Sequence, residues 1–174
     1  EMLVDFVALE QGCTLADAQT FEKAAGGAPA NVAGGVRRLG RSAGFLGQVG
    51  DDEFGRFLAT TLDEYGVDTR GLRVTAEART ALAFVSRLPG GERDFMFYRH
   101  PSADMLWRPA DVDLACAANT RVFHHGSISL ISEPSRSATR AAIAAARAAG
   151  ALISYDPNIR PALWPDAVTA RAVM

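Results

Sequence analysis

Residues 25–33, AGGAPANVA, predict a loop that passes directly into a helix. The paired Gly26 and Gly27 let the backbone adopt positive φ and approach a bound molecule closely. Pro29 suits the first helical turn, where its missing N–H group costs nothing. One turn into the helix, Asn31 offers both a donor and an acceptor to hydroxyl groups. The stretch is therefore either a tight turn alone or part of a site for a small polar ligand.

The composition around this stretch is that of a globular protein. The chain has 174 residues, of which 48% are hydrophobic and 22% charged, so we expect one core and a single domain. Its formal net charge is -2 and no Lys/Arg run alternates with aromatic residues, so we expect no direct nucleic-acid partner. No apolar run reaches the roughly 18 residues that cross a bilayer, so we expect no membrane partner. Cys13 and Cys116 lack metal-ligand spacing, which favours free thiols in a reducing compartment and no metal site.

Both ends of the sequence suggest a longer polypeptide. The chain begins with Glu1 directly before the strand-like run 2–9, and it stops at Met174 inside an expected helix. We therefore expect residues on each side of this chain.

Extended and helical patterns alternate along most of the sequence, which predicts βαβ units and a parallel sheet covered by helices. The fold class expected from this rhythm is α/β. Besides the first strand at 2–9, the expected strands are 43–49, 121–125 and 151–155, and the expected helices are 29–39, 52–65, 114–118 and 133–149.

Residues 80–87 and 93–98 break this rhythm because they read as two strands of an antiparallel hairpin. Leu82, Phe84, Phe95 and Phe97 are expected to form one apolar face of it. An isolated hairpin is marginally stable in water, so something must cover that face. Two explanations stay open. The apolar face of the hairpin packs on the main body of the protein, or the hairpin is a mobile lid whose far side contacts another subunit.

Three groups of polar residues are expected near the carboxyl ends of strands, where open α/β sheets bind ligands. One is the segment 98–104, which leaves the hairpin and would bring the phenol of Tyr98 and the cation of Arg99 back over the sheet edge. Asp5 is flanked by apolar residues and needs a partner, which sugar hydroxyls, a backbone amide or an arginine could supply. Asp156, Asn158 and Arg160 follow the strand 151–155. Arg160 could neutralise a phosphoryl group, since a guanidinium matches phosphate geometry. The alternative is an Asx-turn with a solvated arginine.

Other chemical motifs are missing. His124 and His125 precede Gly126 and Ser127 without a G-x-S-x-G elbow, and adjacent strand residues point to opposite faces. We expect one histidine against the core and one near a cleft. The sequence also has no G-x-x-x-x-G-K-[ST] phosphate loop.

Taken together, several segments closely resemble the PfkB carbohydrate kinases of the ribokinase-like superfamily, and within it the fructokinases of plants and related bacteria. The first signature of that family is matched by the glycine-rich stretch and by GQVGDDEFG at 47–55. The further matching segments are TALAFV at 80–85, ERDFMFYR at 92–99, PSADML at 101–106, GSISL at 126–130 and SYDPN at 154–158.

The resemblance implies a ribokinase-like fold, in which helices flank a parallel sheet and a small antiparallel β lid covers the sugar. Residues 1–174 would be the N-terminal part of one kinase domain, truncated, with lid elements at about 5–20 and 72–99. The implied activity is transfer of the γ-phosphoryl group of ATP, with Mg²⁺, to the 6-hydroxyl of fructose. Relatives also imply a homodimer formed through the lid, and a cytoplasmic or plastid protein.

The resemblance also assigns roles to residues of this chain. Arg160 would stabilise the charge of the transition state, and no other catalytic residue is expected among these positions. Substrate-binding roles fall on Asp5, Gly26, Gly27, Asn31, Tyr98, Arg99, Asp156 and Asn158.

The family's catalytic base is the Asp of a G-A-G-D motif, and these 174 residues contain no such motif. We therefore expect the fragment alone to be inactive. A kinase of ribose or 2-keto-3-deoxygluconate, and a non-catalytic PfkB-like subunit of a larger assembly, stay open as alternatives.

Overall fold

The computed structural model describes all residues from 1 to 174. Its strands are β1 (Leu3–Gln11), β2 (Phe21–Gly26), β3 (Gly47–Gly50), β4 (Leu72–Thr75), β5 (Leu82–Arg87), β6 (Arg93–Tyr98), β7 (Val122–His125) and β8 (Leu152–Tyr155). Its helices are α1 (Ala28–Arg38), α2 (Glu53–Glu64), α3 (Leu114–Ala118), α4 (Ser135–Ala148) and α5 (Ala167–Val173).

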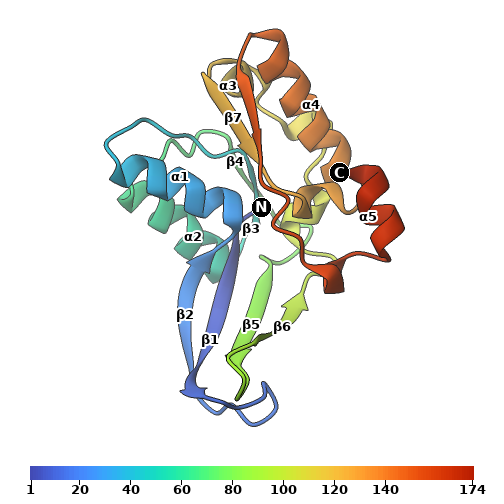
Figure 1. The fold of residues 1–174 in the computed structure, drawn as a ribbon. Helices are drawn as coiled ribbons and strands as arrows, with labels where there is room; N and C mark the ends of the chain where they lie inside the picture. Colours follow the sequence, from blue (N-terminus) through green and yellow to red (C-terminus); the bar gives the residue numbers. More distant parts are fainter.

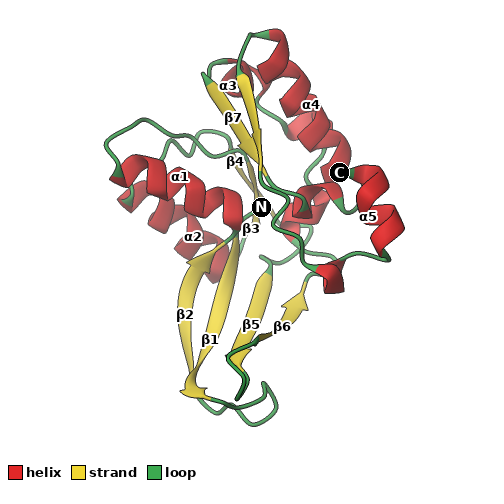
Figure 2. Cartoon of the chain, in the orientation of Figure 1, coloured by secondary structure: helices red, strands yellow, loops and turns green.

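The strands form three sheets of two kinds. The pairs β3-β4 and β7-β8 are parallel, whereas the larger sheet has the order β2-β1-β5-β6 and pairs antiparallel at both of its edges. The four-stranded sheet extends away from the helices, which flank the parallel pairs on two sides (Figure 1, Figure 2). This arrangement confirms the expected α/β fold with a separate antiparallel sheet.

The expected helices form because each has a clear stop and one apolar face. Gly40, Gly66 and Gly150 follow α1, α2 and α4 with φ of 75°, 70° and 85°, a conformation that glycine adopts without strain. Leu58 and Leu62 of α2 are 0% and 1% exposed in the main core. Burial of each contributes about 1.5–3 kcal/mol, which fixes α2 against the parallel strands and the base of β1.

The antiparallel hairpin is confirmed, but its expected apolar face is wrong. Phe84 pairs with Met96 and Val85 with Phe95, so Phe84 and Phe95 lie on opposite faces of the sheet. The five-residue connection between the strands sets this register, and a shift of one residue moves every side chain to the other face. Phe84 stacks on Phe6 at 5.1 Å, on the face that contacts α2.

The antiparallel sheet also differs in extent from the lid elements expected at about 5–20 and 72–99. Residues 21–26 belong to it as β2, whereas Leu72–Thr75 pairs with β3 in the parallel layer. Asp5 lies within β1 rather than beyond the carboxyl end of a parallel strand, because β1 pairs with β2 and β5. This placement puts the Asp5 side chain on the face of the sheet opposite to Phe6.

Two further observations concern the chain as a whole. No helix has both the length and the apolar character that crossing a membrane requires. Cys13 and Cys116 are free thiols, as expected, and each is partly exposed.

Candidate functional site

The Asp5 carboxylate lies directly over Gly26. A Cβ atom added at Gly26 would lie 2.2 Å from Asp5 Oδ2, so the missing side chain is what makes room for the carboxylate. These residues are brought together because Leu3 pairs with Gly26 and Asp5 with Ala24 across β1 and β2. Two residues expected to bind one ligand are therefore neighbours at the base of the sheet.

Asp5 is half-buried, and no group in the chain donates a hydrogen bond to its carboxylate. Burial raises the pKa of Asp5 above its ordinary value, and the charges of Arg160 and Arg93 oppose that rise. A backbone amide or an ion-paired arginine would have satisfied this carboxylate from within the chain, but neither contacts it. The unpartnered acceptor can therefore receive hydrogen bonds from a bound molecule.

The glycine-rich stretch starts α1 beside this carboxylate. Gly27 has φ of 106°, and a Cβ atom there would lie 2.6 Å from the Glu1 carbonyl oxygen, so only glycine fits without strain. Glu1 Oε1 accepts a hydrogen bond from the Ala28 N–H at 3.3 Å. Pro29 occupies the first helical turn, as expected. Asn31 follows on the exposed surface of that turn, with no partner for its amide in the chain.

The segment after β8 reaches the start of α1. A Cβ atom at Gly126, which ends β7, would lie 3.6 Å from both Pro29 Cγ and the Asp156 carbonyl oxygen. Asp156 Oδ1 accepts from the Asn158 N–H at 3.0 Å, so the Asx-turn of the alternative interpretation is present. Asn158 adopts the left-handed region at φ 42°, which directs the chain onward to Arg160. Asp156, Asn158 and the helix start thus border one region.

Arg160 is held between this turn and the antiparallel sheet, and is not a freely solvated side chain. Its Nη1 donates to Asn158 Oδ1 at 2.7 Å, and its guanidinium carbon lies 5.5 Å from the Phe95 ring centroid. Phe95 is on the same face of the sheet as Asp5, and this contact was missed from the sequence. Strand alternation with the observed hairpin register would have revealed it.

The structure places Tyr98 and Arg99 apart from Asp5, and the substrate-binding roles expected for them stay predictions. Tyr98 is opposite Leu82, and its ring packs at 5.5 Å against Phe84, on the face that turns away from Asp5. Arg99 is 4% exposed and forms a buried ion pair with Asp104. Alternation along β6 explains the placement of Tyr98, and the nearby carboxylate, which neutralises the guanidinium, explains that of Arg99.

A small hollow of about 50 Å³ lies between β3, β7 and the start of the chain. His124 and His125 both border it, and their side chains lie on opposite faces of the strand, where His124 Nδ1 lies 3.0 Å from Ser154 Oγ. Burial lowers the pKa of His125, whose ring stacks on Tyr155 at 4.6 Å. Nδ1 of His125 lies 3.2 Å from the Gly126 carbonyl oxygen. The histidines therefore support the strand ends, and no group of three potential metal ligands occurs in the chain.

Comparisons with known proteins identify the family of the chain. Residues 1–174 match the family described as "pfkB family carbohydrate kinase". Fructokinase-1 of Oryza sativa subsp. japonica is 57% identical over 98% of this chain and 53% of its own length. A probable chloroplastic fructokinase of Arabidopsis thaliana, fructokinase-6, is 54% identical over 98% of this chain and 44% of its own length. The chain thus spans about half the length of the curated relatives that it matches.

A solved structure also has this fold. Fructokinase from Vibrio cholerae O395, in a form with bound fructose, ADP and calcium ion, is similar to the chain with a TM-score of 0.85 at 34% identity. The match covers 99% of this chain and 53% of that protein.

Proposed function

Because the chain belongs to the PfkB family of carbohydrate kinases, we propose that the protein containing it phosphorylates fructose. In this reaction the 6-hydroxyl oxygen forms a bond to the γ-phosphorus of ATP, the bond to ADP breaks, and the hydroxyl proton passes to a base. The observation that carries the proposal is the half-buried Asp5 carboxylate, which lies over Gly26 without a hydrogen-bond donor of its own. A sugar supplies several donors in one rigid molecule.

We propose that Asp5 and Asn31 hold sugar hydroxyls, while Gly26 and Gly27 leave room for the ring. Asp156 and Asn158 shape the opposite border of the site. Arg160 is the cation of the site, and its charge suits the negative charge that develops on a transferring phosphoryl group. Its contact with Phe95 places that charge next to the antiparallel sheet.

The 174 residues fit the sugar better than the nucleotide. They contain no phosphate-binding loop, no G-A-G-D motif and no cluster of metal ligands. We therefore propose that residues outside these 174 hold ATP and Mg²⁺. ATP would supply the phosphoryl group. Within the chain, the antiparallel sheet acts as a lid that excludes water, which would otherwise compete with the sugar as acceptor.

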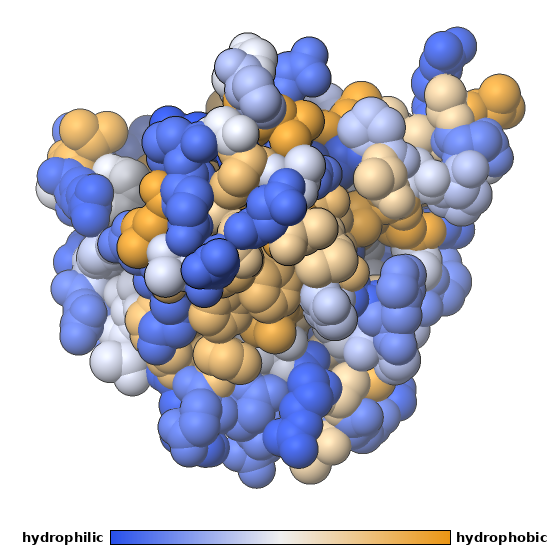
Figure 3. Space-filling model, turned by 90° about the horizontal axis from the view of Figure 1, so that it is seen from below, coloured by the Kyte–Doolittle hydropathy of each residue, from blue (hydrophilic) through white to orange (hydrophobic).

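We further propose that the lid forms a homodimer contact. Met96 and Tyr98 are 43% and 57% exposed on its face opposite to Asp5. Seen from below, apolar side chains gather in the middle of the molecular surface and hydrophilic ones surround them (Figure 3). The cytoplasm is the proposed compartment, with a plastid as the alternative that the chloroplastic relative supports.

The experiment is ATP-dependent phosphorylation by the full-length protein with fructose, ribose and 2-keto-3-deoxygluconate, measured as ADP release. We expect fructose to be the preferred acceptor and the product to carry phosphate at position 6. Asn31→Ala should weaken fructose binding about ten-fold or more, because two hydrogen bonds are lost. Asn119→Ala, also at an exposed asparagine, is the matched control and should leave binding unchanged. Absence of ADP release with fructose would refute the proposal.

A further inference from the structure

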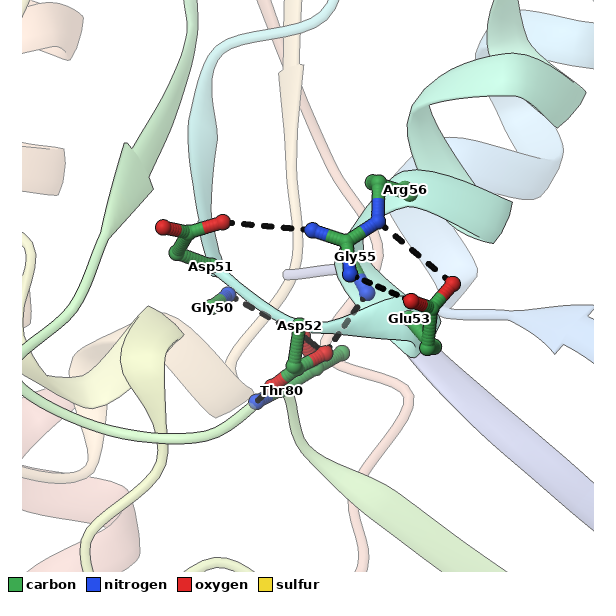
Figure 4. Close-up of polar contacts among 7 residues, drawn as sticks. All are labelled: Gly50, Asp51, Asp52, Glu53, Gly55, Arg56 and Thr80. Atoms are coloured by element: carbon green, nitrogen blue, oxygen red, sulfur yellow. Dashed lines mark hydrogen bonds and ion pairs between the residues drawn. The ribbon is translucent and has the colours of Figure 1, made fainter.

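A compact hydrogen-bond network joins the start of α2 to the residue that precedes β5 (Figure 4). Asp52 Oδ2 accepts from the Thr80 N–H at 2.8 Å, and the Thr80 hydroxyl donates to Asp52 Oδ1 at 2.8 Å. The same hydroxyl accepts from the Gly50 N–H at 3.0 Å. Asp52 Oδ1 also accepts from the Gly55 N–H at 2.8 Å, which caps α2. Each oxygen of Asp52 thus contacts Thr80.

The network is buried and tightly packed. Thr80 is 3% exposed. A Cβ atom at Gly55 would lie 2.0 Å from the Gly50 carbonyl oxygen, and one at Gly50 would lie 2.6 Å from the Thr80 nitrogen. Burial alone would raise the pKa of Asp52, but the hydrogen bonds from Thr80 and Gly55 outweigh it and lower that pKa. The carboxylate is therefore held in its charged form by the contacts it makes.

The network lies at the base of the antiparallel sheet. Strand register places Ala25, Val4, Leu82 and Tyr98 side by side near the end of the sheet closest to the helices, while the other end projects outward (Figure 1). Thr80 stands two residues before Leu82. Thr80 therefore lies beside one of the points at which the chain passes between the helices and the sheet, and its bonds to Asp52 oppose rotation there.

Thr80 is connected to the sugar site through a short covalent and hydrogen-bonded path. The Val4 N–H donates to the Ala81 carbonyl oxygen at 3.0 Å, and Asp5 pairs with Ala83 across β1 and β5. A displacement of Thr80 would consequently move the strand that carries Asp5. Asp52 and Thr80 have no contact with Asp5 themselves.

We propose that Asp52 and Thr80 are positioning residues that fix the angle of the antiparallel sheet, and with it Asp5, over the sugar site. This inference rests on the proposed function. A helix cap alone explains one hydrogen bond, from Gly55 to Oδ1. It does not explain why Oδ2 receives the Thr80 N–H from a segment 28 residues further along the chain.

Asp52→Asn separates the two roles. Asparagine caps a helix about as well as aspartate, so its amide oxygen keeps the bond from Gly55. Its NH₂ group, however, then faces the Thr80 N–H, and two donors cannot bond to each other. Thr80→Val tests the second contact between the two residues, because valine has nearly the same shape and keeps the backbone N–H but lacks the hydroxyl that bonds to Asp52 Oδ1. Thr80→Ser restores the hydroxyl.

The experiment uses the full-length protein and measures fructose KM, ATP KM, kcat, calorimetric fructose affinity and the thermal midpoint. We expect Asp52→Asn and Thr80→Val each to raise fructose KM and weaken fructose binding about ten-fold, equivalent to about 1.4 kcal/mol. ATP KM should stay unchanged, and Thr80→Ser should restore fructose KM. The matched control is Thr61→Val, which removes a hydroxyl bonded only to Phe57 within α2, and it should match the wild type.

Two results would overturn the inference. Wild-type fructose KM in both folded variants would show that the contact does not position Asp5. A fall in activity that follows only the folded fraction, with fructose and ATP affected equally, would show a purely structural role. Should Thr80→Val fail to fold, Asp52→Asn alone decides between these results. The wild-type protein in the same assay tests the proposed function separately, since only that function fails if wild type neither binds nor phosphorylates fructose.

Discussion

Gly26→Ala offers a direct test of how the site is built. The new Cβ atom would lie 2.2 Å from Asp5 Oδ2, whereas ordinary contact begins at 3.4 Å, so the carboxylate must retreat by about 1.2 Å. Misplacement of about 1 Å in a preorganised site costs about a hundred-fold, so fructose affinity should fall by that factor, or by about 2.8 kcal/mol. The backbone at Gly26 does not have positive φ, so alanine is tolerated there.

Stability should change little in the same variant. The obstructing atom is the end of a half-buried side chain that can rotate, and alanine reduces the entropy of the unfolded chain by about 0.4–1 kcal/mol, which offsets part of the strain. Titration calorimetry with fructose and thermal unfolding of the full-length protein measure the two effects. Gly35→Ala in α1 is the control, because a Cβ atom there meets nothing within 4 Å. Fructose affinity within two-fold of wild type in Gly26→Ala would refute the assignment of Asp5 to the sugar.

Two further predictions concern Asp5 and Phe95. The folded-state pKa of Asp5 is raised, so the stability that this group contributes is present at low pH and is lost as the pH rises through that pKa. Asp5→Asn should therefore raise the thermal midpoint of unfolding at pH 7 and raise it less near pH 4. The same variant should weaken fructose binding. An equal gain at both pH values would contradict the burial argument. Phe95→Leu removes a cation–π contact with Arg160 of about 0.5–1 kcal/mol, so kcat should fall about two- to five-fold. Phe84→Leu, on the opposite face, should leave kcat unchanged, and equal losses in both variants would contradict a specific role for Phe95.

Local patterns were sufficient to predict the elements of the body. The glycine after each long helix and the apolar spacing within it placed α1, α2 and α4 to within two residues. It was harder to predict which strands share a sheet, because this depends on pairing between segments that are distant in the sequence. The sequence of β1 reads as an ordinary buried strand, and only its pairing with β2 and β5 places Asp5 in the antiparallel sheet.

The same difference between local sequence pattern and strand pairing decides which features of the candidate site could be predicted. Asp5, Gly26, Asn31 and Arg160 could be selected from residue chemistry and family resemblance. The placement of Tyr98 away from Asp5, and of Phe95 on the same face as Asp5, follows from the hairpin register, which the sequence of its five-residue connection does not determine. The ion pair of Arg99 with Asp104 was not predicted, because a turn separates the two residues and nothing in the spacing indicates that their side chains are buried together.

The antiparallel sheet is attached to the rest of the molecule at one end, and the proposed sugar site lies close to that attachment. A rotation of the sheet therefore moves its far end much more than it moves the site. β1 has nine residues, so it reaches about 30 Å, and Asp5 lies about 7 Å from its start. A rotation of about 10° would carry the tip through about 5 Å but move Asp5 by little more than 1 Å. The outer end of the sheet would therefore sweep about four times as far as Asp5, whose own shift of about 1 Å is already large enough to weaken binding.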